Sequence, residues 1–130
     1  MRILIADDNE MVRRGIRGLL FSQTTWEVCG EAIDGTEAVL KARELLPDLI
    51  LLDVSMPGIS GLEAARLLRQ EVPKAKILVM SHHDAAQLLP RALEAGAHAC
   101  VDKSILSTDL LPTINSVKGR SEDRGIASAE

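Results

Sequence analysis

Five polar residues stand at or just after the ends of short apolar runs, and their side chains are of the types that bind cations or react with anions. They are Asp7 and Asp8 after RILIA, Asp53 at the end of LILLD, Ser81 at the end of KILVMS, and Lys103 after ACVD. Taken singly, each has a structural explanation: an Asp-Asp-Asn stretch caps a helix through Asp8 or Asn9, a hydroxyl ends a strand, and a lysine lies in solvent. Turn chemistry does not explain all five together, so the set favours a functional site.

Three carboxylates held close together repel one another, by about 4 kcal/mol for each pair at ~4 Å and an effective dielectric constant of about 20. A divalent cation with oxygen ligands offsets this cost, and Mg²⁺ fits best because it takes one or two carboxylates, keeps several waters and often binds phosphate. A carboxylate beside Mg²⁺ is also a competent nucleophile towards a phosphoryl group. We therefore expect Mg²⁺ at Asp7, Asp8 and Asp53. Lys103 and Ser81 would then surround the oxygens of the transferred group.

Short apolar runs alternate five times with longer amphipathic segments along the chain, a pattern typical of β-α pairs. The runs 3–6, 49–52 and 77–80 are continuously apolar, as strands of a parallel sheet covered on both faces are. Five such pairs in this length leave no room for a closed barrel. The pattern predicts an α/β fold with a doubly wound, five-stranded parallel sheet of the flavodoxin-like (βα)5 type and strand order 2-1-3-4-5.

In such a sheet the carboxyl ends of the strands meet at one edge, and ligands bind where the strand order reverses. Strands 1 and 3 are neighbours at that point, which brings Asp53 close to Asp7 and Asp8. Ser81 and Lys103 follow the next two strands and lie on the same rim. Asp53 therefore ends a buried strand because the strand is a rigid mount for its carboxylate.

Local signals indicate where several helices begin and end. Ser60 is placed to cap the third helix, with Glu63 three residues further on. Gly96 stands where the fourth helix ends. Pro90 falls inside that fourth segment and removes a backbone hydrogen bond, so we expect this helix to start late or to bend.

The composition is that of one globular domain: 130 residues, 46% hydrophobic and 26% charged. A net charge of −4 and a pI near 5.4 disfavour binding of nucleic acid or an anionic membrane. No run approaches the ~20 apolar residues that span a bilayer, and acidic residues come too early for a signal peptide, so we expect a cytoplasmic protein. Cys29 and Cys100 are expected to be buried, reduced thiols. Residues 1–118 are expected to form the domain, and residues 119–130 a flexible tail or linker.

Four motifs, in order, resemble the receiver domain of two-component response regulators: ADD at 6–8, DVSMPGISG from 53, MS at 80–81 and DKS at 102–104. The resemblance covers residues 1–118 and is greatest to receivers that precede a helix-turn-helix DNA-binding domain, through PGISGLEAARLLR and ALEAGAHACVDKS. The resemblance implies that Asp53 is the phosphoacceptor. It implies that Asp8 binds Mg²⁺ directly, that Asp7 binds it through water, and that the main-chain carbonyl of Ser55 is the last protein ligand. It also implies that the Ser81 side chain moves with the phosphoryl group and that Lys103 forms an ion pair with that group.

The resemblance further implies a phosphoprotein that receives its phosphoryl group from a sensor histidine kinase. Such a protein is not an enzyme, beyond its own phosphorylation and slow autodephosphorylation. Phosphorylation then changes a protein-protein surface, and a homodimer is a possible product.

Two positions depart from the family pattern in ways that affect signalling. Cys100 stands where the family usually has a switch aromatic, and Trp26 and Phe21 are the chain's two aromatic residues. The residue after Ser81 is His82, where a small residue is common, and His83 follows it. Neighbours on an extended chain point to opposite sides, which disfavours a shared metal site for this pair. With no aromatic at position 100, we expect the fourth helix and the loop before it to carry the signal.

Two other functions stay open. One is an unphosphorylated pseudo-receiver that acts only through protein interactions, which the substitutions at Cys100 and His82 allow. The other is a phosphatase of the haloacid-dehalogenase type, which also uses an Asp nucleophile with Mg²⁺. Those enzymes have a D-x-D motif whose second Asp is a general acid, and Ser55 occupies that position here.

Overall fold

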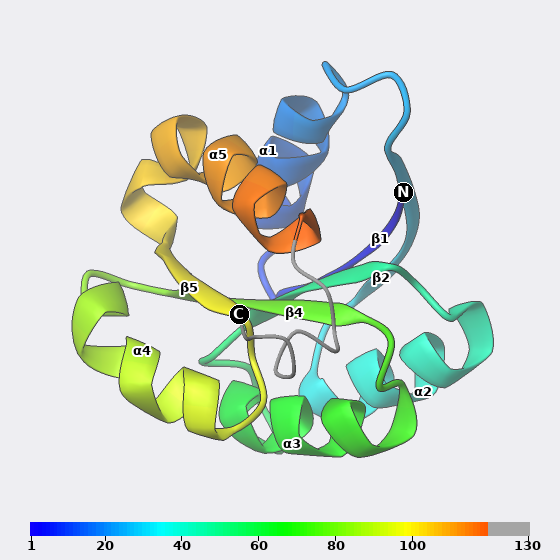
Figure 1. Cartoon of the computed structure of the whole chain (residues 1–130), viewed down its shortest axis with the longest axis vertical. Helices are drawn as coiled ribbons and strands as arrows, with labels where there is room; N and C mark the ends of the chain where they lie inside the picture. The colour runs from blue at the N-terminus through cyan, green and yellow to red at the C-terminus, as the bar shows by residue number, and fades with distance from the viewer. Residues whose placement is uncertain (120–130) are drawn as a thin grey trace.

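The computed structural model describes residues 1–119, in which strands and helices alternate along the chain (Figure 1). The strands are β1 (Arg2–Ala6), β2 (Glu27–Ala32), β3 (Leu49–Asp53), β4 (Lys76–Ser81) and β5 (Ala99–Asp102). The helices are α1 (Glu10–Leu20), α2 (Gly35–Leu45), α3 (Gly61–Glu71), α4 (Ala85–Glu94) and α5 (Leu106–Lys118), with a short 3-10 helix η1 (Lys103–Ile105) before α5. The alternation of strand and helix predicted from the apolar runs is confirmed.

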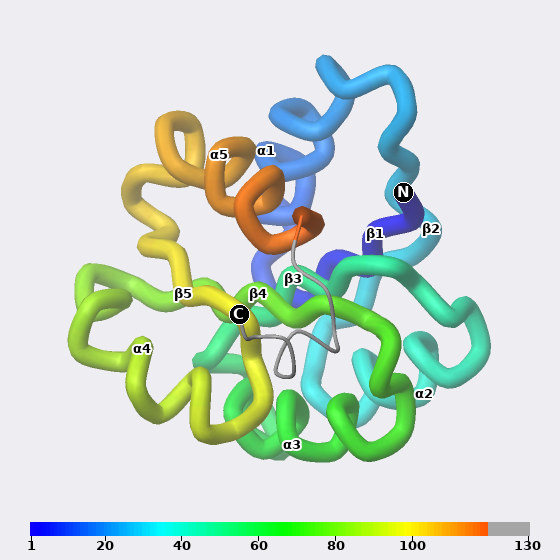
Figure 2. Tube along the Cα trace, in the orientation of Figure 1, coloured from blue at the N-terminus to red at the C-terminus, as the bar shows by residue number. Residues whose placement is uncertain are grey.

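The sheet has the order β2-β1-β3-β4-β5, and every neighbouring pair of strands is parallel. The path of the chain through this sheet can be followed in Figure 2. The predicted doubly wound fold and its strand order are therefore correct. β1 and β3 lie side by side at the centre, where the strand order reverses, and their carboxyl ends meet there.

Helices cover both faces of the sheet, with α1 and α5 on one face and α2, α3 and α4 on the other (Figure 1). Side chains of β1 alternate between the two cores: Ile3 and Ile5 pack towards α1 and α5, whereas Leu4 and Ala6 pack towards α2 and α3. All five residues of β3 are buried, including Asp53. Burial on both faces explains why these strands read as continuous apolar runs.

Capping residues hold the loops that carry the polar edge of the sheet. The hydroxyl of Ser60 accepts a hydrogen bond from the backbone N–H of Glu63 at 3.1 Å, as predicted. Asn9, rather than Asp8, caps α1, because its side-chain oxygen accepts from the backbone N–H groups of the first turn.

Gly96 follows α4 with φ +102°, and a Cβ there would overlap the side chain of Arg69, so glycine is required at this position.

We expected α4 to start late or to bend; the late start is wrong, and the bend stays a prediction. This helix begins at Ala85 and continues through Pro90 to Glu94. Backbone hydrogen bonds on either side, from Leu88 to Asp84 and from Ala95 to Arg91, hold the helix although proline donates none. α5 also contains a proline, Pro112, and is likewise continuous.

Three other expectations concern the whole chain. Cys29 and Cys100 are free thiols, as predicted, but both are partly exposed, because each lies on an edge strand of the sheet. Within residues 1–119, no helix is long and apolar enough to cross a membrane. The predicted flexible tail or linker lies, apart from Gly119, outside the described residues.

Candidate functional site

Three carboxylates gather at the carboxyl edge of the sheet, as predicted. Asp7 directly follows β1, Asp8 comes next on the loop to α1, and Asp53 ends β3. Each offers an oxygen that lies within 4.8 Å of the others. Asp7 and Asp53 are buried, at 0% and 2% exposure, whereas Asp8 is exposed. The cluster is therefore anchored inside the protein and open to solvent on one side.

Lys103 reaches this cluster from the end of β5. Its Nζ lies 2.7 Å from Oδ2 of Asp7 and 3.3 Å from Oδ2 of Asp53. The lysine side chain is only 6% exposed. Burial alone would lower the pKa of Lys103, but contact with the two carboxylates raises it above its ordinary value. Lys103 is therefore a permanently charged member of the site.

Backbone N–H groups fix the orientation of the two buried carboxylates. The N–H of Asn9 donates to Oδ1 of Asp7 at 2.9 Å, and the N–H of Ser55 donates to Oδ1 of Asp53 at 3.2 Å. Each carboxylate thus has one oxygen held by the following loop and the other directed at Lys103.

The electrostatics of the cluster call for a further cation. Burial, and to a smaller extent the charge of Asp7, raises the pKa of Asp53, although the Ser55 N–H and Lys103 act in the opposite direction. Oδ2 of Asp7 is fully buried, and its contact within residues 1–119 is the ion pair with Lys103. Receiver domains bind Mg²⁺ at an acidic pocket, and this set of hard oxygen donors fits that ion.

Ser81 and Ser55 are the two serines predicted to belong to the site. Ser81 ends β4, next to β3, and is 1% exposed. Its hydroxyl lies 3.9 Å from the thiol of Cys100 on β5. Ser55 is in the exposed turn after Asp53. The role of its carbonyl as a metal ligand stays a prediction, as do the separate roles assigned to the other site residues.

The histidine pair lies beside the site, on the loop from β4 to α4. Both side chains are exposed, and their ring centroids are 6.1 Å apart. His83 has φ 58°, which is uncommon for a residue other than glycine. The loop that leaves Ser81 therefore turns sharply before α4 begins.

Two residues that the sequence did not single out also shape the site. Gly61 begins α3 directly against the backbone of Asp53 and Val54, and a Cβ there would overlap both. Arg13, on α1, donates from Nη1 to the backbone carbonyl of Asp7 at 2.7 Å. A glycine after the Ser60 cap was a usable signal, whereas nothing in the spacing of Arg13 indicated its contact.

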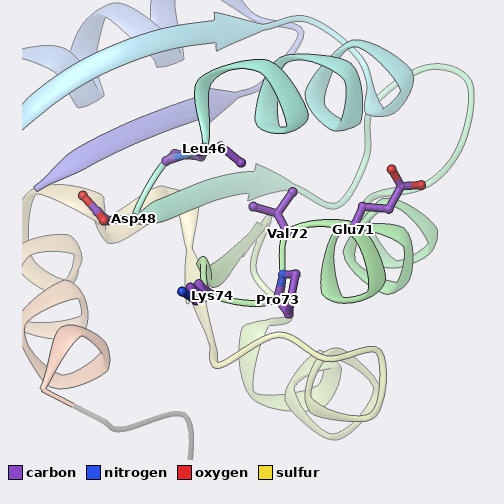
Figure 3. A pocket seen from close by; sticks show the side chains of 7 residues that line it. Leu46, Asp48, Glu71, Val72, Pro73 and Lys74 are labelled. Carbon is purple, nitrogen blue, oxygen red and sulfur yellow. The ribbon is translucent and has the colours of Figure 1, made fainter.

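A separate pocket lies at the opposite edge of the sheet, at the amino ends of β3 and β4 (Figure 3). Its lining comes from the loops before these strands, including Leu46, Asp48, Val72 and Pro73. No residue of the acidic cluster lines it, so it is not part of the candidate site.

Comparison with known proteins agrees with this geometry. The sequence model for the response regulator receiver domain matches residues 3–115. The response regulator protein VraR of Staphylococcus aureus is 37% identical over 114 residues, which are 88% of this chain and 54% of that protein. The chain thus spans about half the length of the curated relatives it matches.

Solved structures with the same fold include further response regulators. A LuxR-family two-component response regulator from Aurantimonas sp. SI85-9A1 has a TM-score of 0.84 and 36% identity, over 90% of this chain and 84% of that one. The receiver domain of the putative response regulator NarL from Mycobacterium tuberculosis has a TM-score of 0.83 and 32% identity, over 92% of this chain and 97% of that one. By its family match and its fold, this chain belongs to the response regulator receiver domains of two-component signal transduction.

Proposed function

We propose that this chain accepts a phosphoryl group on Asp53. Mg²⁺ would be held by the carboxylates of Asp7, Asp8 and Asp53 and by the main-chain carbonyl of Ser55, with Asp8 a direct ligand and Asp7 acting through water. The observation that supports this most is the position of the Asp53 carboxylate. It ends a buried strand within 4.8 Å of two other carboxylates, and the ammonium group of Lys103 lies 3.3 Å away.

The chemistry needs only one nucleophile. An oxygen of Asp53 forms a bond to phosphorus as the bond from phosphorus to the donor's leaving group breaks, and the electron pair departs with that group. Bound Mg²⁺ would supply positive charge to the phosphoryl oxygens. Lys103 pairs with one of these oxygens, and the hydroxyl of Ser81 donates a hydrogen bond to another.

Receiver domains are in general signalling domains that sensor histidine kinases phosphorylate. For this chain, the donor is a sensor histidine kinase or a small phosphodonor such as acetyl phosphate. Beyond its own phosphorylation, the chain catalyses only slow autodephosphorylation. Its net charge of −4 supports a domain that by itself binds neither nucleic acid nor an anionic membrane. Its proposed location is the cytoplasm.

The output is a change of protein-protein surface. The phosphoryl group carries about 1.5 to 2 negative charges. It replaces the single charge of the Asp53 carboxylate, beside the carboxylates of Asp7 and Asp8. The phosphoryl group draws the side chains of Ser81 and Lys103 inward, and the segment from His82 to about Leu93 is re-ordered as a result. We also propose that two phosphorylated copies dimerise through this changed surface. Light scattering with and without beryllofluoride measures the molar mass and so tests for the dimer.

The alternatives predict different chemistry at the same residues. A haloacid-dehalogenase-type phosphatase needs a general acid two residues after its nucleophile, and Ser55 has no carboxyl group. A pseudo-receiver would keep the fold but take no phosphoryl group. The intact acidic cluster with a buried lysine favours the phosphoacceptor.

Intact-mass spectrometry after incubation with acetyl phosphate tests the proposal. Wild type with Mg²⁺ should gain one phosphoryl group, and wild type with EDTA should gain almost none. Asp53→Asn should gain none, whereas Asp109→Asn, a control on α5, should be labelled like wild type. No labelling of wild type would favour the pseudo-receiver, and equal labelling of Asp53→Asn would exclude Asp53 as the acceptor.

A further inference from the structure

We infer that Arg13 is a positioning residue for the metal site, which sets the direction of Asp8 by holding the peptide group between Asp7 and Asp8. The inference deepens the proposed function and rests on it. Its basis is a chain of contacts that leads from the acidic loop, through Arg13, to Glu31 on β2.

The guanidinium group of Arg13 joins two parts of the fold. Nη1 donates to the backbone carbonyl of Asp7 at 2.7 Å, and Nε donates to Oε1 of Glu31 at 2.8 Å. The arginine side chain is only 13% exposed. Two hydrogen bonds from one planar, partly buried group leave the guanidinium little freedom to move.

Glu31 is itself held in place. Its other oxygen, Oε2, accepts from Nη1 of Arg17 at 2.5 Å, one turn further along α1. Its backbone carbonyl accepts from Nζ of Lys41 on α2. Glu31 therefore connects β2 with α1 and α2, and Arg13 extends this network as far as the acidic loop.

The contact matters more for Asp8 than for Asp7. Asp7 is buried, its N–H donates to the carbonyl of Ala32 at 3.0 Å, and one of its carboxylate oxygens accepts from Asn9. Asp8 is exposed, and no hydrogen bond or ion pair within residues 1–119 holds its side chain. The direction of the Asp8 carboxylate therefore depends on its backbone, which begins at the peptide group that Arg13 holds.

Charge and position make opposite predictions for the removal of Arg13. If the arginine acted only through its charge, its loss would make the site more negative, and Mg²⁺ would bind more tightly. If it acts by position, its loss frees the peptide group before Asp8, and Mg²⁺ binds more weakly. The sign of the change in affinity therefore separates the two.

Titration calorimetry of the metal-free chain with MgCl₂ tests this. We expect Arg13→Ala to weaken Mg²⁺ binding by about tenfold, as for the loss of one charge-assisted hydrogen bond. Arg13→Lys keeps the charge but lacks the planar fork that spans both partners, and should weaken binding by at least about threefold. Arg17→Ala is the matched control: it removes one cation from Glu31 but leaves the contacts of Arg13 with Glu31 and with Asp7 in place. Its Mg²⁺ affinity should stay within about twofold of wild type.

Melting temperatures in EDTA distinguish an effect of Arg13 on the position of Asp8 from a general loss of fold stability. Both Arg13→Ala and Arg17→Ala should melt at a lower temperature than wild type, because each removes an ion pair with Glu31. If Arg13→Ala shows no cooperative melt, the Mg²⁺ affinity of Arg13→Lys alone tests the inference. Unchanged or tighter Mg²⁺ binding by the Arg13 variants, or an equal loss in Arg17→Ala, overturns the inference alone. Absence of Mg²⁺ binding by wild type overturns the proposed function, and this inference with it.

Discussion

The hydroxyl of Ser81 lies 3.9 Å from the thiol of Cys100, on neighbouring strands of the sheet. The residue proposed to follow the phosphoryl group is therefore in contact with the position where the family usually has a switch aromatic. An aromatic side chain buries about 150 to 250 Å² and signals by moving between exposed and buried positions. A thiol is too small to make that change, so the signal needs another route.

The loop after β4 and helix α4 offer this route. His83 is in a left-handed conformation, Asp84 makes no side-chain capping hydrogen bond, and Pro90 removes one hydrogen bond inside the helix. A helix with fewer hydrogen bonds opens at a lower free-energy cost. We expect beryllofluoride with Mg²⁺ to change hydrogen exchange mainly between His82 and Leu93. Changes confined to β5 and α5 would mean that Cys100 transmits the signal after all.

Removal of Lys103 should destabilise the metal-free protein, because the two carboxylates beside it lose their buried cation. We expect Lys103→Met to lower the free energy of unfolding by roughly 1 to 3 kcal/mol in EDTA, less than for a fully enclosed pair because the site is open at Asp8. Mg²⁺ should then stabilise the variant more than it stabilises wild type. Urea unfolding with and without Mg²⁺ measures both effects. Equal stability of the two proteins in EDTA would show that the ion pairs contribute nothing.

The pH dependence of stability should reveal the Glu31 network. Burial alone would raise the pKa of Glu31, but hydrogen bonds from Arg13 and Arg17 lower it below its ordinary value. A carboxyl group with a lowered folded-state pKa stabilises the fold above its unfolded pKa of about 4.3, and this contribution is lost as the pH falls through the folded-state pKa. We expect Glu31→Gln to cost about 1 kcal/mol at neutral pH, since the pair is partly exposed. The difference should shrink as the pH falls below about 4.3 in urea melts, and a constant difference would count against the network.

Mg²⁺ should raise stability through the acidic cluster. A ligand that binds only the folded chain adds about 2.7 kcal/mol at a hundredfold excess over its dissociation constant. Thermal melts should therefore shift upward with Mg²⁺ in wild type and in Asp109→Ala, a control outside the cluster. In Asp8→Ala the shift should be much smaller. If Mg²⁺ raises the melting temperature of Asp8→Ala as much as that of wild type, Asp8 is not a ligand of the ion.

Much of the fold and the core of the site could be predicted because both follow from the strands. The apolar runs predict a parallel sheet, and the residues after those runs must meet at its carboxyl edge, as Asp7, Asp53 and Lys103 do. The role of Arg13 could not be predicted, because its two partners come from different elements and depend on side-chain direction. Of the two outcomes expected for α4, the late start is wrong because backbone hydrogen bonds on either side of Pro90 hold the helix from Ala85, and the bend stays a prediction.

The central claim is that Asp53 carries the phosphoryl group, and the most direct measurement identifies that residue chemically. After treatment with acetyl phosphate and Mg²⁺, borohydride reduces an aspartyl phosphate to homoserine and releases phosphate. Tandem mass spectrometry then finds the converted residue. We predict homoserine at position 53, with Asp7 and Asp8 unchanged, and none when Mg²⁺ is replaced by EDTA. Homoserine at position 7 or 8, or no homoserine in a sample whose intact mass shows the phosphoryl group, would contradict the claim.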